Sequence, residues 1–69
     1  MVEVFKTNIN DQALANKIAC DLHNHFPGGK INFDLDDCDK ILRIENDNVH
    51  PIEVTKILKH KGFLCEVLE

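Results

Sequence analysis

Apolar and polar residues alternate at the start of the chain and then change to a helical spacing. Residues 2–7 alternate over most of their length and are rich in β-branched and aromatic types, which predicts a strand. From Asp11 onward the apolar residues recur every four positions, so residues 11–26 are predicted to form one amphipathic helix. Its apolar stripe consists of Leu14, Ile18, Leu22 and Phe26, and Pro27, Gly28 and Gly29 end it.

The second half of the chain repeats these patterns. Residues 31–35 and 40–45 alternate again, and the acidic residues between them predict a tight turn, which makes the pair a hairpin. Pro51 suits the first turn of a helix, because an N–H at that position has no helical partner to lose. We therefore expect a second helix over residues 51–61, followed by a last strand over residues 63–68.

The predicted order is strand, helix, strand, strand, helix, strand, in a single domain that spans residues 1–69. Right-handed crossovers place both helices on the same face of one sheet. The expected fold class is therefore α+β, a ferredoxin-like βαββαβ two-layer sandwich with an antiparallel sheet of order 4-1-3-2.

A chain of this length buries only about 60% of its unfolded surface. That leaves little room for a deep catalytic site and predicts that the protein is not an enzyme.

Charge and cysteine content narrow the range of partners. The net charge of -4 disfavours nucleic acid, whose binding depends on Lys and Arg against phosphate. No apolar stretch approaches the roughly 20 residues that cross a bilayer. Residues 1–15 also lack the pattern of a secretory signal, so no membrane association is expected. Three widely spaced cysteines, Cys20, Cys38 and Cys65, predict free thiols and a cytoplasmic protein.

Several segments together resemble a heavy-metal-associated domain, the fold of small copper chaperones. The resembling segments are the Ile18/Leu22 stripe, the Pro27-Gly28 break, the strand over residues 31–35, and Gly62-Phe63 followed by Cys65-Glu66-Val67. The resemblance implies a Cys-x-x-Cys motif between the first strand and the first helix, where two thiolates bind a soft ion such as Cu(I). Asp11 and Leu14 stand at those two positions here. We therefore expect the scaffold without its copper site and without a cofactor.

Two other groups of residues have ligand chemistry. Cys20 and His23 are three residues apart on the first predicted helix and share one face, so they are candidate ligands for Zn(II) or Ni(II) if others join them. Residues 34–45 have part of the spacing of a calcium loop, but Asp39 stands where that loop needs glycine. We expect a solvated acidic turn there instead.

The alternation in the predicted strands also assigns two faces to the sheet. The face toward the helices is predicted to carry Val2, Val4, Phe33, Leu35, Leu42, Ile44, Cys65 and Val67. The opposite face then carries Phe5, Ile41, Arg43, Leu64, Glu66 and Leu68, together with Glu3, Thr7 and Asn32. RNA-recognition domains have the same fold and bind bases with aromatic residues on the open face of the sheet. Phe5 is the single aromatic residue here and acidic residues surround it, so RNA binding is not expected.

No predicted element is left to cover this second face, so a contiguous apolar cluster on it predicts a protein partner or a homodimer. Scattered exposed apolar residues are the alternative, since every protein surface carries some. The resulting expectation is a non-catalytic protein-interaction or regulatory domain, with Arg43 and Glu66 at the rim of the contact. The alternative function is heavy-metal binding or transport through non-standard Cys and His ligands.

Overall fold

The computed structural model describes residues 1–68 and has the predicted order of elements. The strands are β1 (Val2–Thr7), β2 (Lys30–Asp34), β3 (Ile41–Glu45) and β4 (Cys65–Val67), and the helices are α1 (Gln12–His25) and α2 (Pro51–His60). The predicted boundaries agree to within one residue for every element except β4. That last strand is three residues long, and the Leu64 N–H before it bonds the side chain of Asn8 instead of the backbone of β1.

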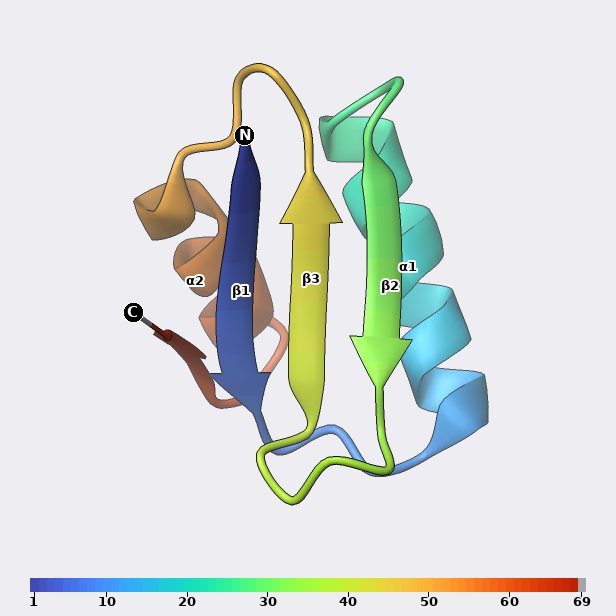
Figure 1. The fold of residues 1–69 in the computed structure, drawn as a ribbon. Coiled ribbons are helices and arrows are strands. Elements are labelled where there is room, and N and C mark those ends of the chain that lie inside the picture. The colour runs from blue at the N-terminus through green and yellow to red at the C-terminus, as the bar shows by residue number, and fades with distance from the viewer. Residues whose placement is uncertain (69) are drawn as a thin grey trace.

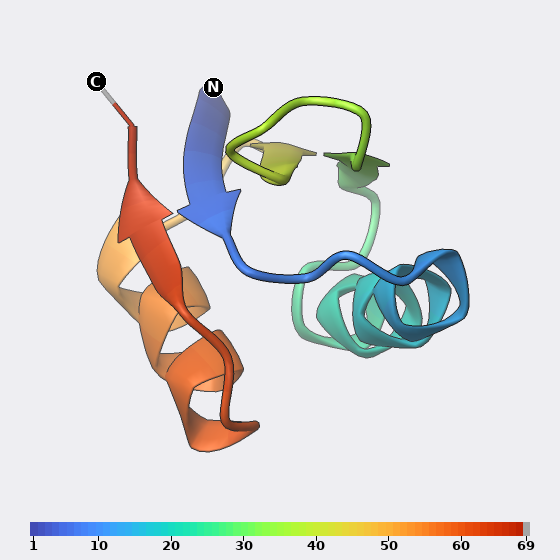
Figure 2. The ribbon, with the colours of Figure 1, turned by 90° about the horizontal axis from the view of Figure 1, so that it is seen from below.

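The sheet is antiparallel, with the strand order β2-β3-β1-β4. Counted from the β4 edge, the same order reads 4-1-3-2. Both helices lie on one face of this sheet, α1 beside β2 and α2 beside β4, as Figure 1 and Figure 2 show from two directions. The other face of the sheet is covered by no helix or strand among residues 1–68. The molecule is thus a small two-layer α+β fold with one open sheet face.

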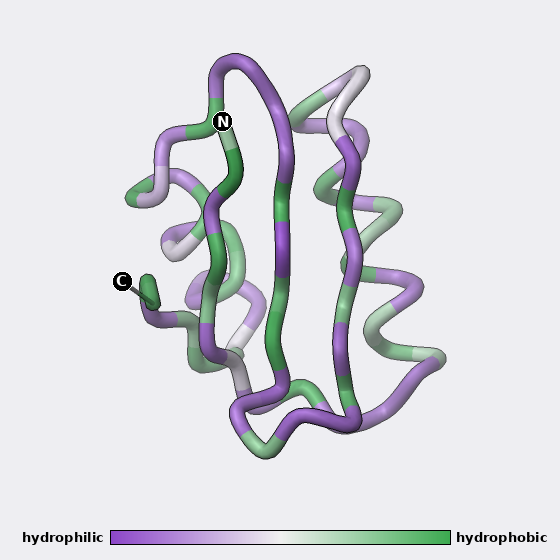
Figure 3. Tube along the Cα trace, viewed as in Figure 1, coloured by the Kyte–Doolittle hydropathy of each residue, from purple (hydrophilic) through white to green (hydrophobic). Residues whose placement is uncertain are grey.

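The core lies between the sheet and the two helices. Three residues of the α1 stripe are buried and the fourth is half-buried; in chain order they are Leu14 (half-buried), Ile18, Leu22 and Phe26. The sheet and α2 contribute the buried residues Phe5, Ile31, Leu42, Ile44, Val54, Leu58 and Cys65. Ile9 and Val49, in the connections that precede the helices, are buried as well. Figure 3 shows the alternation of hydrophobic and hydrophilic residues along the strands that produces this arrangement.

The first strand faces the opposite way from the prediction. Phe5 lies directly across from Leu42 of β3, and both side chains are 0% exposed. Directly paired residues of an antiparallel sheet point to the same face, so Phe5 points to the helices. Glu3 shares that side of the strand. Val2 and Val4 therefore point outward, and Val2 is 53% exposed.

The physical reason is the adjacent pair Val4 and Phe5, which gives β1 two possible phases. A shift of one residue turns every side chain of a strand to the other face. Burying the larger Phe5 removes more apolar surface from water than burying a valine. The same phase buries Thr7, which was also predicted to point outward. Its Oγ1 donates a 2.6 Å hydrogen bond to the Lys40 carbonyl, so the buried hydroxyl is satisfied.

Besides Val2 and Val4, three residues predicted to lie in the core are only partly buried. Val67 lies opposite Phe5 on the helix side, yet it is 41% exposed because β4 is a short edge strand. Phe33 and Leu35 are half-buried, because β2 and the residue that follows it form the other edge of the sheet. Edge positions have a neighbouring strand on one side only, so the predicted alternation is correct there but burial is incomplete.

Local sequence features set the ends of the helices. Asp11 is the N-cap of α1, and its side chain accepts a hydrogen bond from the Ala13 N–H. Gly28 and Gly62 follow the two helices with positive φ angles of 83° and 93°, which glycine adopts without strain. Neither of the two helices in the described residues is long and apolar enough to cross a membrane.

Candidate functional site

The connection between β1 and α1 is held in place by its own side chains. Thr7 Oγ1 accepts a 3.2 Å hydrogen bond from the Ile9 N–H, and Ile9 is fully buried. Asn8 Oδ1 accepts a 3.0 Å hydrogen bond from the Leu64 N–H, which ties the connection to the residue before β4. The loop is therefore anchored both to the core and to the end of the chain.

Asp11 and Leu14, the two positions at which the sequence resemblance would place copper-binding cysteines, have structural roles. Asp11 caps α1, with one carboxylate oxygen 3.4 Å from the Ala13 nitrogen. Leu14 is half-buried and packs against the core. One carboxylate and one aliphatic side chain do not make the thiolate pair that Cu(I) prefers. The residues of this loop thus do not fit a copper site.

Cys20 and His23 are both exposed on α1. Among residues 1–68, no third His, Cys, Asp or Glu lies close enough to share an ion with them. All three cysteines are free, and Cys65 is the buried one, as the sequence predicts for the last strand. Burial raises the pKa of the Cys65 thiol to about 11. The thiol of Cys65 is therefore protonated and poorly reactive near neutral pH.

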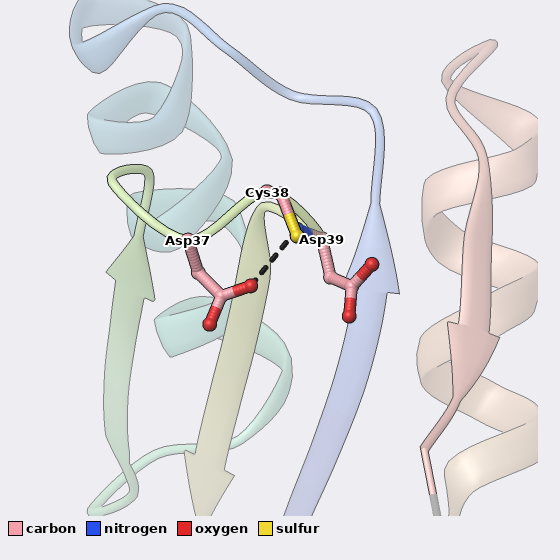
Figure 4. Close-up of side chains that lie close together, drawn as sticks. All are labelled: Asp37, Cys38 and Asp39. Atoms are coloured by element: carbon pink, nitrogen blue, oxygen red, sulfur yellow. Dashed lines mark hydrogen bonds between the residues drawn. The ribbon is translucent and has the colours of Figure 1, made fainter.

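The turn between β2 and β3 gathers Asp37, Cys38 and Asp39, as Figure 4 shows. One ligand atom of each residue lies within 4.8 Å of the others. Asp37 Oδ1 accepts a 2.9 Å hydrogen bond from the Asp39 N–H, and the Asp39 carboxylate forms a 3.7 Å ion pair with Lys6. These contacts stabilise the turn itself, and Lys6 competes with any cation for Asp39. The segment is a hairpin turn rather than the helix–loop–helix of a calcium site.

The open sheet face differs from the predicted interaction face at its centre. Phe5 is buried, so it is not available to a partner. Lys6 occupies the outward position of β1 between Ile41 of β3 and Glu66 of β4. Leu64 is exposed at the far end of β4, beside the β1–α1 connection. The apolar cluster predicted for this face therefore lacks Phe5, and Lys6 lies where the prediction placed an apolar centre.

A smaller aliphatic cluster occupies the outward positions of β1 and the residue after β4. Val4 lies beside Leu68, whose N–H donates a 2.8 Å hydrogen bond to the Val4 carbonyl. Val2 is two residues away on the same side of β1. Val4 is half-buried, whereas Leu68 is 37% exposed and Val2 more so. We call Val2, Val4 and Leu68 the sheet patch.

Charged residues border the sheet patch. Arg43 of β3 lies across from Val4 on one side, and Glu66 lies two residues before Leu68 on the other side. Both charged side chains are exposed. A shallow hollow of about 200 Å³ opens beside Arg43, and Val4 and Ile41 contribute to its lining. Ile41, Arg43, Glu66 and Leu68 thus lie on the face where the sequence predicted them.

Sequence reasoning missed a second surface, which lies between α1 and α2. Asp21 of α1 and Lys61, which follows α2, form a 2.7 Å ion pair. The hydrogen bond and the charge of Lys61 lower the pKa of the Asp21 carboxyl below its usual value. A hollow of about 390 Å³ lies beside this pair and is lined by His25, Lys56, Ile57, His60 and Lys61. The paired residues are 40 positions apart, so no local pattern in the sequence indicates the surface.

Comparison of the chain with protein-family models, curated proteins and solved structures found no match. The resemblance to heavy-metal-associated domains therefore rests on the residue pattern and on the order of strands and helices. What the chain does has to be inferred from its own surfaces and loops.

Proposed function

We propose that this chain is a non-catalytic protein-interaction domain with a ferredoxin-like fold, built on a metallochaperone-like scaffold that lacks the metal site. The order of elements, the antiparallel sheet and the position of both helices on one face support the fold assignment. The roles of Asp11 as a helix cap and Leu14 as a packing residue support the loss of the metal site. Free thiols at all three cysteines favour a cytoplasmic location.

The observation that carries the proposal is the sheet patch on the open face. No helix or strand among residues 1–68 covers it, and two of its three side chains are exposed. Full burial of a large aliphatic side chain contributes about 1.5–3 kcal/mol. Each member of the patch already has part of its surface buried, so a docked partner gains a fraction of that amount from each. The patch therefore supports a specific but weak contact.

A second copy of the chain is the partner that the charges on this face favour. Arg43 and Glu66 lie on opposite sides of β1, on β3 and β4 respectively. A two-fold axis that runs along β1 places β3 of each copy over β4 of the other. Arg43, which is level with Val4, then lies two residues along the strand from Glu66 of the other copy, and its long side chain can reach that carboxylate. Lys6 of each copy lies near the axis, where the Glu66 paired with it on β4 offsets part of the repulsion between the two lysines. With three aliphatic side chains per copy, we expect a dimer with a Kd of roughly 10 μM to 1 mM.

Sedimentation equilibrium over a concentration series tests this proposal. The double variant Val4→Ser/Leu68→Ser should weaken dimerisation by roughly tenfold or more. Ile52→Ser is the matched control, because Ile52 is a 70% exposed aliphatic residue on α2, in the other layer of the molecule. A chain that remains monomeric at millimolar concentration contradicts the proposal. So does a dimer that the control weakens as much as the double variant does.

A charge exchange at the rim tests the geometry of the contact. Arg43→Glu should weaken the dimer, because it replaces an attraction between Arg43 and the nearby Glu66 of the other copy by a repulsion in each half of the interface. The double variant Arg43→Glu/Glu66→Arg restores opposite charges and should recover most of the lost affinity. If the double variant is weaker than the single variant, Arg43 does not lie near Glu66 of the other copy and the two-fold arrangement is wrong.

A further inference from the structure

Residues of both helices line two hollows that share Lys61. α1 and α2 lie on the same face of the sheet but pack against different strands, as Figure 2 shows. The ion pair between Asp21 and Lys61 links them. Lys61 lines the hollow of about 390 Å³. Both residues of the pair line a second hollow of about 280 Å³, together with Leu14, Lys17, Ile18 and Phe63. We call the two hollows together the helix groove.

The charges of the chain are unevenly divided between the two helices and the rest of the chain. Residues 12–25 and 51–61 contain four lysines and two acidic residues, a net charge of +2 with the histidines neutral. The whole chain carries -4, so the remaining residues carry -6. The carboxylate that lines the groove, that of Asp21, is already paired with Lys61. The helix layer is thus the cationic side of an acidic protein.

The larger hollow is lined by both cationic and apolar side chains. Ile57 is half-buried and lines the hollow together with Lys56, Lys61 and two histidines, His25 and His60. Lysine stems add apolar surface while their ammonium groups stay in water. This surface complements a peptide that carries one apolar side chain between carboxylates. The apolar side chain contacts Ile57, and the carboxylates reach the ammonium groups around it.

We propose that the helix groove binds an acidic segment of a partner protein, with one apolar side chain over Ile57, one carboxylate against Lys56, and a second carboxylate that competes with Asp21 for Lys61. A second copy of this chain fits less well, because its acidic turn enters the groove in a head-to-tail contact that does not close. A nucleic acid fits less well too, because the residues outside the two helices carry -6 in total and repel a long polyanion. The helix groove and the sheet patch lie on different sides of the molecule. Variants in one surface therefore test its proposed partner without changing the other surface.

A labelled synthetic peptide with one leucine between two pairs of glutamates is the probe, and fluorescence anisotropy with the full chain at low salt is the readout. Lys56→Glu should weaken binding by roughly tenfold or more, because it replaces attraction by repulsion inside the groove. Lys30→Glu is the matched control, since it makes the same charge change on an exposed residue of β2, outside the groove. Solvent screening should limit the effect of the control to less than about twofold.

A second peptide, with alanine in place of leucine, separates docking over Ile57 from attraction between charges. It should bind roughly tenfold more weakly, because it buries less apolar surface. Amide shifts caused by the leucine peptide should fall on residues 56–61 and on His25. The proposal would be overturned if the peptide does not bind at millimolar concentration, or if both lysine variants weaken binding equally. Amide shifts confined to β1 and β4 would also overturn it. Binding of inorganic polyphosphate in the same place, with no difference between the two peptides, would overturn it as well.

Discussion

Phe5 and Leu42 lie directly opposite each other in β1 and β3, and neither side chain is exposed to solvent. This pairing determines which residues of β1 point to the helices. Because side chains alternate along a strand, it also turns Val4 to the open face. The buried aromatic residue and the exposed aliphatic patch are therefore two consequences of one strand register.

The register of β1 predicts which of two adjacent substitutions destabilises the fold. Phe5→Ala should lower the free energy of unfolding by about 3–5 kcal/mol, because it leaves a cavity in the core. Val4→Ala should lower it by at most about 1 kcal/mol, because Val4 lies on the open face. Urea unfolding measures both values. If Phe5→Ala does not fold, Phe5→Leu should still cost more than Val4→Ala. A larger cost for the valine variant contradicts the register.

Thr7 is expected to contribute more to stability than an ordinary surface threonine. Its hydroxyl donates to the Lys40 carbonyl and accepts from the Ile9 N–H, and the residue is buried. Thr7→Val should therefore cost about 1–3 kcal/mol, because two buried backbone groups lose their partner. Thr55→Val is the control, since the Thr55 hydroxyl bonds the Ile52 carbonyl on the exposed side of α2 and should matter by about 0.5 kcal/mol or less. If both variants lower the free energy of unfolding equally, the two hydrogen bonds of the Thr7 hydroxyl do not stabilise the fold.

The buried thiol of Cys65 predicts a loss of stability at high pH. Burial raises its pKa in the folded state from 9.0 to about 11. Between these two values the unfolded chain releases the thiol proton while the folded chain keeps it. Ionisation therefore favours the unfolded state, and the free energy of unfolding should fall as pH rises from about 9 to about 11. The variant Cys65→Ala should have a shallower decline over that range. If the free energy of unfolding falls equally with pH in the wild-type chain and in Cys65→Ala, the Cys65 thiol is not buried in its neutral form.

The loop between β1 and α1 should not capture Cu(I). The reduced chain is titrated with Cu(I) against a competing chelator, and amide shifts locate any bound ion. We expect no shifts at residues 8–15, because Asp11 and Leu14 supply no thiolate. The variant Asp11→Cys/Leu14→Cys is the positive control and should gain a tight site if the scaffold resembles that of copper chaperones. Cu(I) binding by the unmodified loop would contradict the absence of a copper site. If the double cysteine variant does not bind Cu(I) tightly, the scaffold does not resemble that of copper chaperones.

The order of elements follows from the sequence because its signals are local. The α1 stripe, the Pro27 break, Pro51 and the positive-φ Gly62 each act within one or two turns of chain. The register of β1 does not follow in the same way, because Val4 and Phe5 are both apolar and adjacent. The choice between them depends on how much surface each buries against Leu42, and that is decided by packing across the sheet.

The candidate surfaces were predictable to different degrees. Ile41 and Arg43 alternate cleanly with buried neighbours, so their outward direction follows from the pattern in β3. Leu68 was correctly expected on the open face, but its neighbour Val4 was not. Ile9 gave no signal, because one apolar residue between two asparagines has no period. The helix groove depends on the distance between two helices, which no pattern within either helix encodes.

The central claim is that the open face of the sheet, through Val2, Val4 and Leu68, is where a second copy docks. The most direct measurement is a methyl-resolved NMR dilution series of the wild-type chain. The account predicts that the methyl signals of Val4 and Leu68 shift with protein concentration, while the methyl signals of Ile52 on α2 do not. Concentration-dependent shifts at Ile52 and none at Val4 and Leu68, or no shift at any methyl group up to millimolar concentration, would contradict it.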